Sequence, residues 1–243
     1  MKKFLIILAS LSIMGYLAFV VVYFWDSSRN QECNCFEVVV KNSAKTQFVH
    51  AEDIVQLIKS KDLYPVGKRM DEVNTLDIQH AIMTNKLVKS AEVYSTSNGS
   101  IIANIYQRNP ILRVISDTEG HFYVDKNREI MPTSSRFTVH VPIATGNISE
   151  EFAKDKLYDF AKFLYENSEW DAWIEQIVVK KNERVELIPR VGDFRIILGT
   201  LDNYPAKLAK FALFAKNGLN VVGWNRYSEI NLSFDNQVVC TKK

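Results

Sequence analysis

The side chains of this chain that could carry out chemistry are few, and their spacing assembles no catalytic constellation. A metal centre or an acid–base catalyst needs clustered ionisable residues, but the histidines are scattered over different predicted elements. The nucleophile elbow, the metalloprotease helix and the glycine-rich phosphate loop are all absent from the sequence. We therefore predict no catalytic residue, no cofactor and no metal site, and hence a protein that is not an enzyme. The histidines are His50, His80, His121 and His140.

The three cysteines also fit no metal site. Cys33 and Cys35 form a C-x-C pair, and no second cysteine or histidine pair follows at the spacing that a zinc site requires. Because an odd number of cysteines cannot pair completely within one chain, at least one of Cys33, Cys35 and Cys240 must stay free or pair elsewhere. We expect them to be structural or incidental, and an oxidised pair stays open as an alternative.

Composition argues against a nucleic-acid partner. The formal net charge is +2, and acidic and basic residues are interspersed, so the chain lacks the basic footprint of a nucleic-acid-binding protein. Glycine and proline are scarce, which argues against a long disordered linker. The length leaves room for one large domain or two small ones.

An uncharged apolar run covers residues 4–25 and contains no proline. A helix of this length would reach about 33 Å, enough to cross a hydrocarbon core of about 30 Å. Lys2 and Lys3 precede it, whereas Tyr23 and Trp25 fall where an interfacial aromatic belt is expected. The run therefore predicts a transmembrane helix with its N-terminus in the cytoplasm. The alternative is a cleaved signal peptide, but the apolar run is too long and lacks a small-x-small cleavage site.

The next part of the chain predicts a small α+β module. A β-branched strand at residues 36–40 precedes two helices, the first with Ile58 on its buried face and the second capped by Asn74. Asn98-Gly99 then predicts a hairpin with a type I′ turn. The order strand, helix, helix, strand, strand resembles the POTRA domain, a module that extracytoplasmic proteins use to contact other chains.

The remaining residues predict a mostly antiparallel β domain with flanking helices. A hairpin turns at residues 125–128, another strand starts at Arg136, and a helix is capped by Ser149. A three-stranded meander follows, and Pro205 and Gly218 bracket a further helix with a buried face that includes Ala212.

The chain closes with a hairpin whose last strand has no later segment to cover it. Ile230, Leu232 and Phe234 alternate, so we expect them on one buried face. The final strand, residues 237–241, is then an exposed edge, which a protein must shorten, charge or cover with a partner. The predicted partner-binding residues are Phe234, Asp235, Asn236, Gln237, Val238, Val239, Cys240 and Thr241.

Three segments along the chain resemble the bacterial cell-division family FtsQ, called DivIB in Gram-positive bacteria. RNPILRV is similar to its E-R-x-P-x-A junction, FYVDKNREIMP to its F-Y-I-D-x-x-G-x-x-x-P hairpin, and INLSFDNQVV to its closing I-D-L-R-Y-x-N-x-x-V pattern. Two departures stand out: Arg128 replaces the hairpin glycine, and Ser233 replaces the closing arginine. The pattern suggests a Bacteroidetes-type member. The implied organisation is a cytoplasmic tail (1–3), a transmembrane helix (4–25), a linker (26–34), a POTRA-like domain (35–108) and a C-terminal β domain (109–243).

The resemblance implies a non-catalytic, single-pass inner-membrane scaffold at the division septum, with most of the chain in the periplasm. Its partners would be the small coiled-coil division proteins FtsL and FtsB, linked to septal peptidoglycan synthesis, with no nucleic acid and no small-molecule substrate. In the family, the strand that matches residues 237–241 receives an incoming strand from FtsB. Two alternatives are a POTRA-bearing subunit of a secretion or outer-membrane assembly system and a diverged membrane-anchored cell-wall enzyme.

Overall fold

The computed structural model of the protein describes residues 7, 10–21, 31–41 and 47–243. The chain divides into two compact units, Met1–Gln107 (unit 1) and Arg108–Lys243 (unit 2). Residues 7 and 10–21 are helical, and the rest of the predicted transmembrane helix lies outside the described residues. Within the described part of the chain, no helix has the length and apolar character that spanning a membrane requires.

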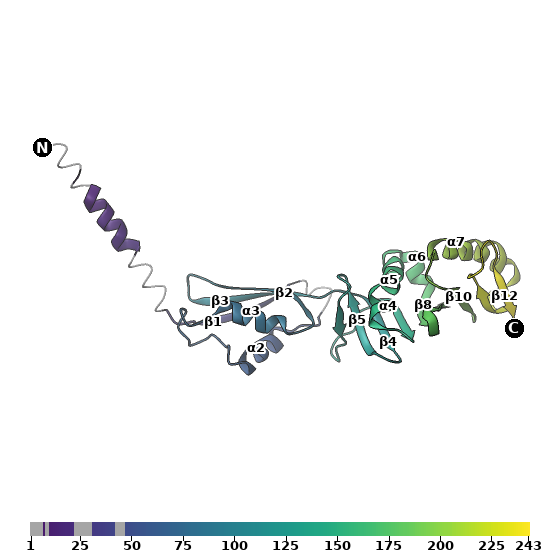
Figure 1. The fold of residues 1–243 in the computed structure, drawn as a ribbon, viewed down its shortest axis with the longest axis horizontal. Coiled ribbons are helices and arrows are strands. Elements are labelled where there is room, and N and C mark those ends of the chain that lie inside the picture. Colours follow the sequence, from purple (N-terminus) through teal and green to yellow (C-terminus); the bar gives the residue numbers. More distant parts are fainter. Residues whose placement is uncertain (1–6, 8–9, 22–30, 42–46) are drawn as a thin grey trace. The chain divides into compact units, whose positions relative to one another are not determined.

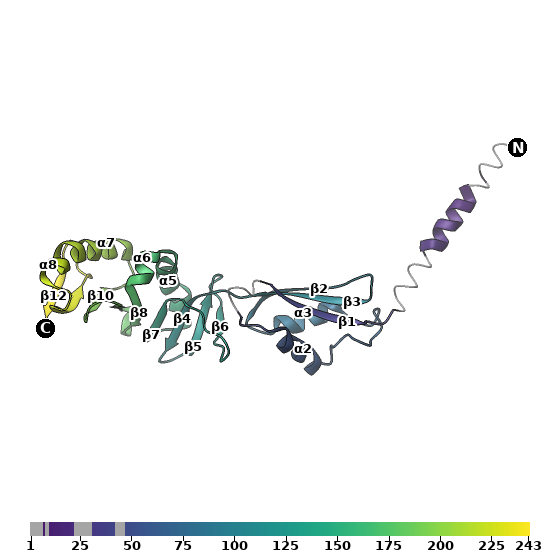
Figure 2. The ribbon, with the colours of Figure 1, turned by 180° about the vertical axis from the view of Figure 1, so that it is seen from behind.

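Unit 1 has the predicted order of strand, helix, helix, strand, strand (Figure 1). Its three-stranded sheet has the order β1-β3-β2, in which β1 runs parallel and β2 antiparallel to β3. Both helices lie on the same side of this sheet in Figures 1 and 2. The elements are β1 (Cys35–Lys41), α2 (Ala51–Ser60), α3 (Thr75–Met83), β2 (Val88–Ser95) and β3 (Ser100–Gln107).

The core of unit 1 forms where the apolar faces of the two helices meet the sheet. Ile54 and Ile58 of α2 are both 0% exposed, and Ile78 and Ile82 of α3 complete the helical side. The predicted cap of α3 is confirmed: the side chain of Asn74 accepts a hydrogen bond from the backbone N–H of Leu76 at 3.0 Å.

The hairpin between β2 and β3 is confirmed, but its predicted turn type is wrong. A type I′ turn needs positive φ at both central residues, whereas in this loop only Gly99 has it, at 81°. The turn instead starts earlier, because the Thr96 carbonyl accepts from the Gly99 N–H at 3.2 Å and the Thr96 N–H donates to the Ser100 carbonyl at 2.9 Å. The Thr96 hydroxyl also accepts from the Ser100 N–H, which holds this longer loop.

Residues 31–34 belong to unit 1, although the sequence predicts a linker over residues 26–34. The Cys33 N–H donates to the Lys68 carbonyl at 2.8 Å, and the Cys33 carbonyl accepts from the Gly67 N–H at 2.9 Å. The Cys33 side chain is 1% exposed, and this burial raises the pKa of its thiol. Residues 26–30 lie outside the described residues. All three cysteines are free thiols.

Unit 2 consists of a large sheet with helices on one face (Figure 2). Its first half contains β4 (Pro110–Ser116), β5 (Gly120–Asp125), β6 (Ile130–Pro132), β7 (Ile143–Gly146), α4 (Glu150–Lys154), α5 (Lys156–Glu166) and α6 (Ser168–Trp173). Its second half contains β8 (Ile174–Val179), the 3₁₀ turn η1 (Lys181–Glu183), β9 (Val185–Pro189), β10 (Arg195–Gly199), α7 (Tyr204–Phe214), the π-helical turn η2 (Ala215–Leu219), α8 (Asn220–Val222), β11 (Tyr227–Asn231) and β12 (Val239–Lys242).

The nine strands of unit 2 follow the order β12-β11-β10-β9-β8-β7-β4-β5-β6. Neighbours are antiparallel except for the pairs β4–β7, β7–β8 and β10–β11. The expected α+β class, with a mostly antiparallel sheet and flanking helices, is therefore confirmed for this unit. β10 and β11 can run parallel because the helical segment α7 to α8 carries the chain back between them.

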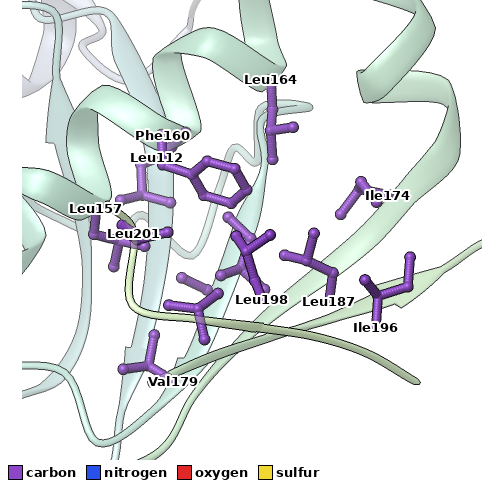
Figure 3. Close-up of a cluster of buried hydrophobic side chains, with 14 of the residues drawn as sticks. Leu112, Leu157, Phe160, Leu164, Ile174, Val179, Leu187, Ile196, Leu198 and Leu201 are labelled. Atoms are coloured by element: carbon purple, nitrogen blue, oxygen red, sulfur yellow. The ribbon is translucent and has the colours of Figure 1, made fainter. Parts of the chain in front are cut away.

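The core of unit 2 lies between the helices and one face of the sheet (Figure 3). Inward-facing aliphatic residues of the strands pack against one side of α5, as the alternating pattern of the strands and the helical spacing dictate. Burial of this apolar surface is the main source of stability for the unit. The side chains drawn there include Leu112, Leu157, Phe160, Leu164, Leu187, Ile196 and Leu198.

Three predictions within unit 2 are wrong in detail. The strand expected from Arg136 starts only at Ile143. The helix capped by Ser149 is two helices, because the chain leaves helical geometry at Asp155. The helix expected to end before Gly218 continues through η2 and α8 to Gly223, which has φ of 94°.

Arg128 contacts the chain at the Asp155 break and takes the place of the hairpin glycine. Its φ is 63°, in the left-handed region that favours glycine. Its guanidinium donates to the carbonyl of Lys154 at 2.9 Å and to the carboxylate of Asp159 at 2.5 Å, and lies 4.5 Å from the ring centroid of Tyr158. The side chain thus bonds the last carbonyls of α4 and offsets the backbone strain.

Two substitutions at Arg128 separate the contribution of its side-chain contacts from the cost of its positive φ. Arg128→Ala is expected to lose these contacts and keep the strained φ, whereas Arg128→Gly loses the contacts but relieves the strain. The glycine variant should therefore be more stable than the alanine variant by about 1 kcal/mol. Urea unfolding of the full-length chain, followed by tryptophan fluorescence, measures the difference. Equal stabilities would contradict the strained backbone at this position.

Candidate functional site

The candidate site is the free edge of the unit 2 sheet, formed by β12 (Figure 1). β12 pairs only with β11, in antiparallel register, with Cys240 opposite Ile230 and Val239 opposite Asn231. The other side of the strand has no neighbour among the described residues. A strand with one unpaired side can accept a further strand through its main chain.

The register identifies the backbone groups that face outward. The Leu232 N–H donates to the Ile197 carbonyl of β10 at 2.8 Å, so the preceding residue, Asn231, points its backbone groups the other way, toward β12. Val239 opposes Asn231 and therefore points its own backbone groups inward. Alternation along the strand then directs the N–H and C=O groups of Cys240 outward, to the free edge.

The same alternation applies to the far end of β12. Thr241 opposes Glu229 and directs its backbone groups inward, whereas Lys242 directs its groups outward. The outward set is thus Cys240 and Lys242, and the inward set is Val239 and Thr241. Sequence alone left this alternation open.

The predicted partner-binding residues fall into two parts of the structure. Val239, Cys240 and Thr241 lie in β12, whereas Phe234 to Val238 form the connection that precedes it. The strand therefore starts two residues later than the sequence predicts. Between β11 and β12 the chain turns at Asp235 and Asn236, and Asn236 adopts the left-handed conformation with φ of 58°.

The expected burial of Phe234 is wrong, since its side chain is 46% exposed. Ile230 and Leu232 are both 0% exposed, as predicted. The alternation stops because the Asn231 side chain accepts from the backbone N–H of Ser233 at 2.9 Å and from its hydroxyl at 2.5 Å, which turns the chain out of the sheet.

Lysine side chains contact the connection that precedes β12 and the residue that follows it. The ammonium of Lys210 donates to the carbonyl of Leu232 at 3.1 Å and also to that of Phe234, which holds the connection against α7. At the far end the ammonium of Lys243 lies 2.7 Å from the carboxylate of Asp193, and this hydrogen bond lowers the pKa of Asp193. These contacts involve the segments on either side of β12, and the strand itself is held by its pairing with β11.

The two faces of β12 differ. Cys240 is half-buried against the core, and burial raises the pKa of its thiol. Val239, on the opposite face, is 43% exposed. An added strand would gain main-chain hydrogen bonds from Cys240 and apolar contact near Val239.

The four histidines lie outside β12. The scattered histidines form no metal cluster within the described part of the chain, and His140 lies 3.7 Å from the carboxylate of Asp171. Among the hydrogen bonds and ion pairs of the described residues, none joins a histidine side chain to β12.

Sequence analysis missed a group of tryptophans on the helical face of unit 2. Trp170, Trp173 and Trp224 line a hollow of about 360 Å³ together with residues of α7 and η2. The three-residue spacing of Trp170 and Trp173 places them on one helical face, but nothing in the sequence brings Trp224 to them.

Two protein-family models match the chain. The model described as FtsQ/DivIB, C-terminal related, matches residues 109–241, which is more than half of the chain. The model of the POTRA-like domain matches residues 31–106. A search of curated proteins found no match.

Proposed function

Because the chain belongs to the FtsQ/DivIB family, we propose that it is a membrane-anchored scaffold of the bacterial division machinery that binds small coiled-coil proteins of the FtsL and FtsB kind. The family consists of division-associated membrane proteins that act as non-catalytic scaffolds. Protein–protein contact in division is therefore the function to be expected of the two units.

The observation that carries the proposal is the free edge of β12. Its outward backbone groups at Cys240 and Lys242 are the donors and acceptors that strand addition uses. Strand addition obtains affinity from main-chain hydrogen bonds, and side chains that alternate along the edge supply specificity. Residues 234–241 would thus form the partner-binding segment.

The location of the protein follows the same reasoning. The apolar run of residues 4–25 would anchor the chain in the inner membrane, with Lys2 and Lys3 on the cytoplasmic side. Units 1 and 2 would then lie in the periplasm at the septum, where the bound partners connect to septal peptidoglycan synthesis.

A POTRA-like module also occurs in the alternative function, a subunit of a secretion or outer-membrane assembly system. The match to the POTRA-like model over residues 31–106 is compatible with both functions. The match over residues 109–241 favours the division scaffold.

Proline substitution tests the edge. Cys240→Pro removes an outward N–H and places a ring at the edge, so affinity of the full-length chain for a purified FtsB-like partner of the same organism should fall at least about tenfold. Cys240→Ala controls for the lost side chain and should bind normally. Thr241→Pro removes an inward N–H and should lower the melting temperature instead.

Melting is recorded for every variant. Normal binding by Cys240→Pro, with normal binding by Lys242→Pro as well, would refute strand addition at β12. If Cys240→Pro fails to fold, Lys242→Pro decides alone, because the Lys242 side chain is exposed and its N–H also points outward.

A further inference from the structure

The hollow on the helical face of unit 2 is lined by four aromatic side chains and two alanines, together with Glu169, Lys216 and Asn220. Trp170 and Trp173 of α6 line it together with Trp224, which follows α8 in the chain. Phe211 of α7, which is 0% exposed, lies at the base. Ala212, expected from the sequence to be buried, is exposed and lines the hollow instead, so the space that a larger residue would fill stays open.

The aromatic rings are held in place by one another. The ring centroids of Trp173 and Trp224 are 5.3 Å apart, and those of Trp173 and Phe211 are 5.9 Å apart in an edge-on arrangement. The indole N–H of Trp224 donates to the side chain of Asn220 at 3.0 Å. Such a site is formed before a ligand arrives, which lowers the entropic cost of binding.

Of the four tryptophans in the chain, all but Trp25 line this hollow. All three are only half-buried. Because tryptophan has a large apolar area and dominates the energetics of interfaces, such a cluster favours a binding site. The hollow also borders the π-helical turn η2, a geometry that is frequent at functional sites.

The rim of the hollow carries opposite charges on its two walls. Glu169 lies on the α6 side, and the sequence from Glu166 to Glu175 contains acidic residues but no lysine or arginine. Lys216 of η2 lies on the other side. Within the described residues Glu169, Glu175 and Lys216 form no ion pair, so their charges are available to a ligand.

We propose that this hollow is a docking site for an amphipathic helix of a partner protein. One large aliphatic side chain of that helix enters the hollow, a basic residue one turn away pairs with the Glu169 side, and an acidic residue on the other side pairs with Lys216. Helix-in-groove recognition uses an apolar anchor side chain with charged residues about one turn away from it. The site is separate from β12 and stands independently of the proposed function.

The tryptophans supply the reporter for the test. The full-length chain is labelled with 5-fluorotryptophan, and each fluorine signal is assigned by single Trp→Phe variants. The probe is an alanine-based helical peptide with a central leucine, two lysines one turn to one side and a glutamate one turn to the other. We expect the signals of Trp170, Trp173 and Trp224 to shift and that of Trp25 to stay.

Two control peptides test the assigned chemistry. Replacing the leucine with alanine should weaken binding about 10- to 100-fold, since the buried side chain supplies most of the affinity. Exchanging the lysines and the glutamate should weaken binding several-fold, and this difference should shrink at high salt. Equal binding of all three peptides would overturn the proposal.

Two variants of α7 complete the test. Ala212→Phe fills the hollow and should abolish the shifts. Ala209→Phe makes the same change at an exposed position of the same helix, outside the hollow, and should leave them intact. The proposal would also be overturned if the leucine peptide at millimolar concentration shifted none of the three signals. N-acetylglucosamine and N-acetylargininamide probe for a sugar site and a cation site, and shifts from either as large as those from the leucine peptide would overturn it as well. Loss of binding at β12 would leave these shifts unchanged.

Discussion

Replacing Asp125 with alanine is expected to lower the free energy of unfolding of unit 2 by about 3–5 kcal/mol. The carboxylate is 1% exposed and receives the guanidinium of Arg108 at 2.8 Å. Its other oxygen accepts from the backbone N–H groups of Asn127 and Glu129 at 2.8 and 2.9 Å. The variant leaves a poorly solvated cation and two turn donors without their acceptor, and both losses are costly.

Two further variants separate the loss of the carboxylate charge from the loss of the acceptor for the turn. Asp125→Asn keeps an acceptor for the turn but removes the charge, so its loss should be intermediate. Arg108→Met leaves the buried carboxylate without its cation and should also destabilise the unit. Urea unfolding of the full-length chain, followed by the tryptophan fluorescence of unit 2, gives the values. A loss below about 1 kcal/mol for Asp125→Ala would contradict the role of this pair.

Replacing Ile58 with aspartate is expected to unfold unit 1. Ile58 is 0% exposed in the core between the helices and the three-stranded sheet. A buried carboxylate without a partner costs more than the several kcal/mol by which a small domain is typically stable. Because unit 2 has its own core, its structure should survive the change.

Hydrogen exchange of the full-length chain distinguishes the two units. Amides of β1 and β3 should lose protection in the Ile58→Asp variant, while those of β8 and β9 keep it. Gln56→Asp introduces the same charge at an exposed position of the same helix and should change neither unit. Retained protection in β3 would show that the face of α2 is misassigned.

Local sequence patterns predicted most of the elements. The alternating and helical spacings gave unit 1 its correct order, and the final hairpin was found from the Asp235-Asn236 turn and the apolar residues around it. These signals suffice where neighbours in sequence are also neighbours in space.

Prediction failed where residues far apart in the chain decide the local structure. The break at Asp155 is contacted by Arg128, which belongs to the distant hairpin of β5 and β6. The tryptophan hollow needs Trp224 to approach α6 from a distant segment. No periodic pattern encodes such contacts. The exposure of Phe234 has a local cause instead: the Asn231 side chain bonds Ser233, two residues later, and turns the chain out of the sheet, which strand alternation does not indicate.

The strand order of unit 2 has a consequence during synthesis of the chain. From β7 to β12 each new strand is added beside its predecessor on the same side of the sheet. A nascent or proteolysed chain that stops after β10 would present Ile196, Ile197 and Leu198 as an unprotected apolar edge, prone to aggregate with other copies. In the structure β11 and β12 cover this edge, and the outermost strand is short and carries Lys242, two features that disfavour edge-to-edge association.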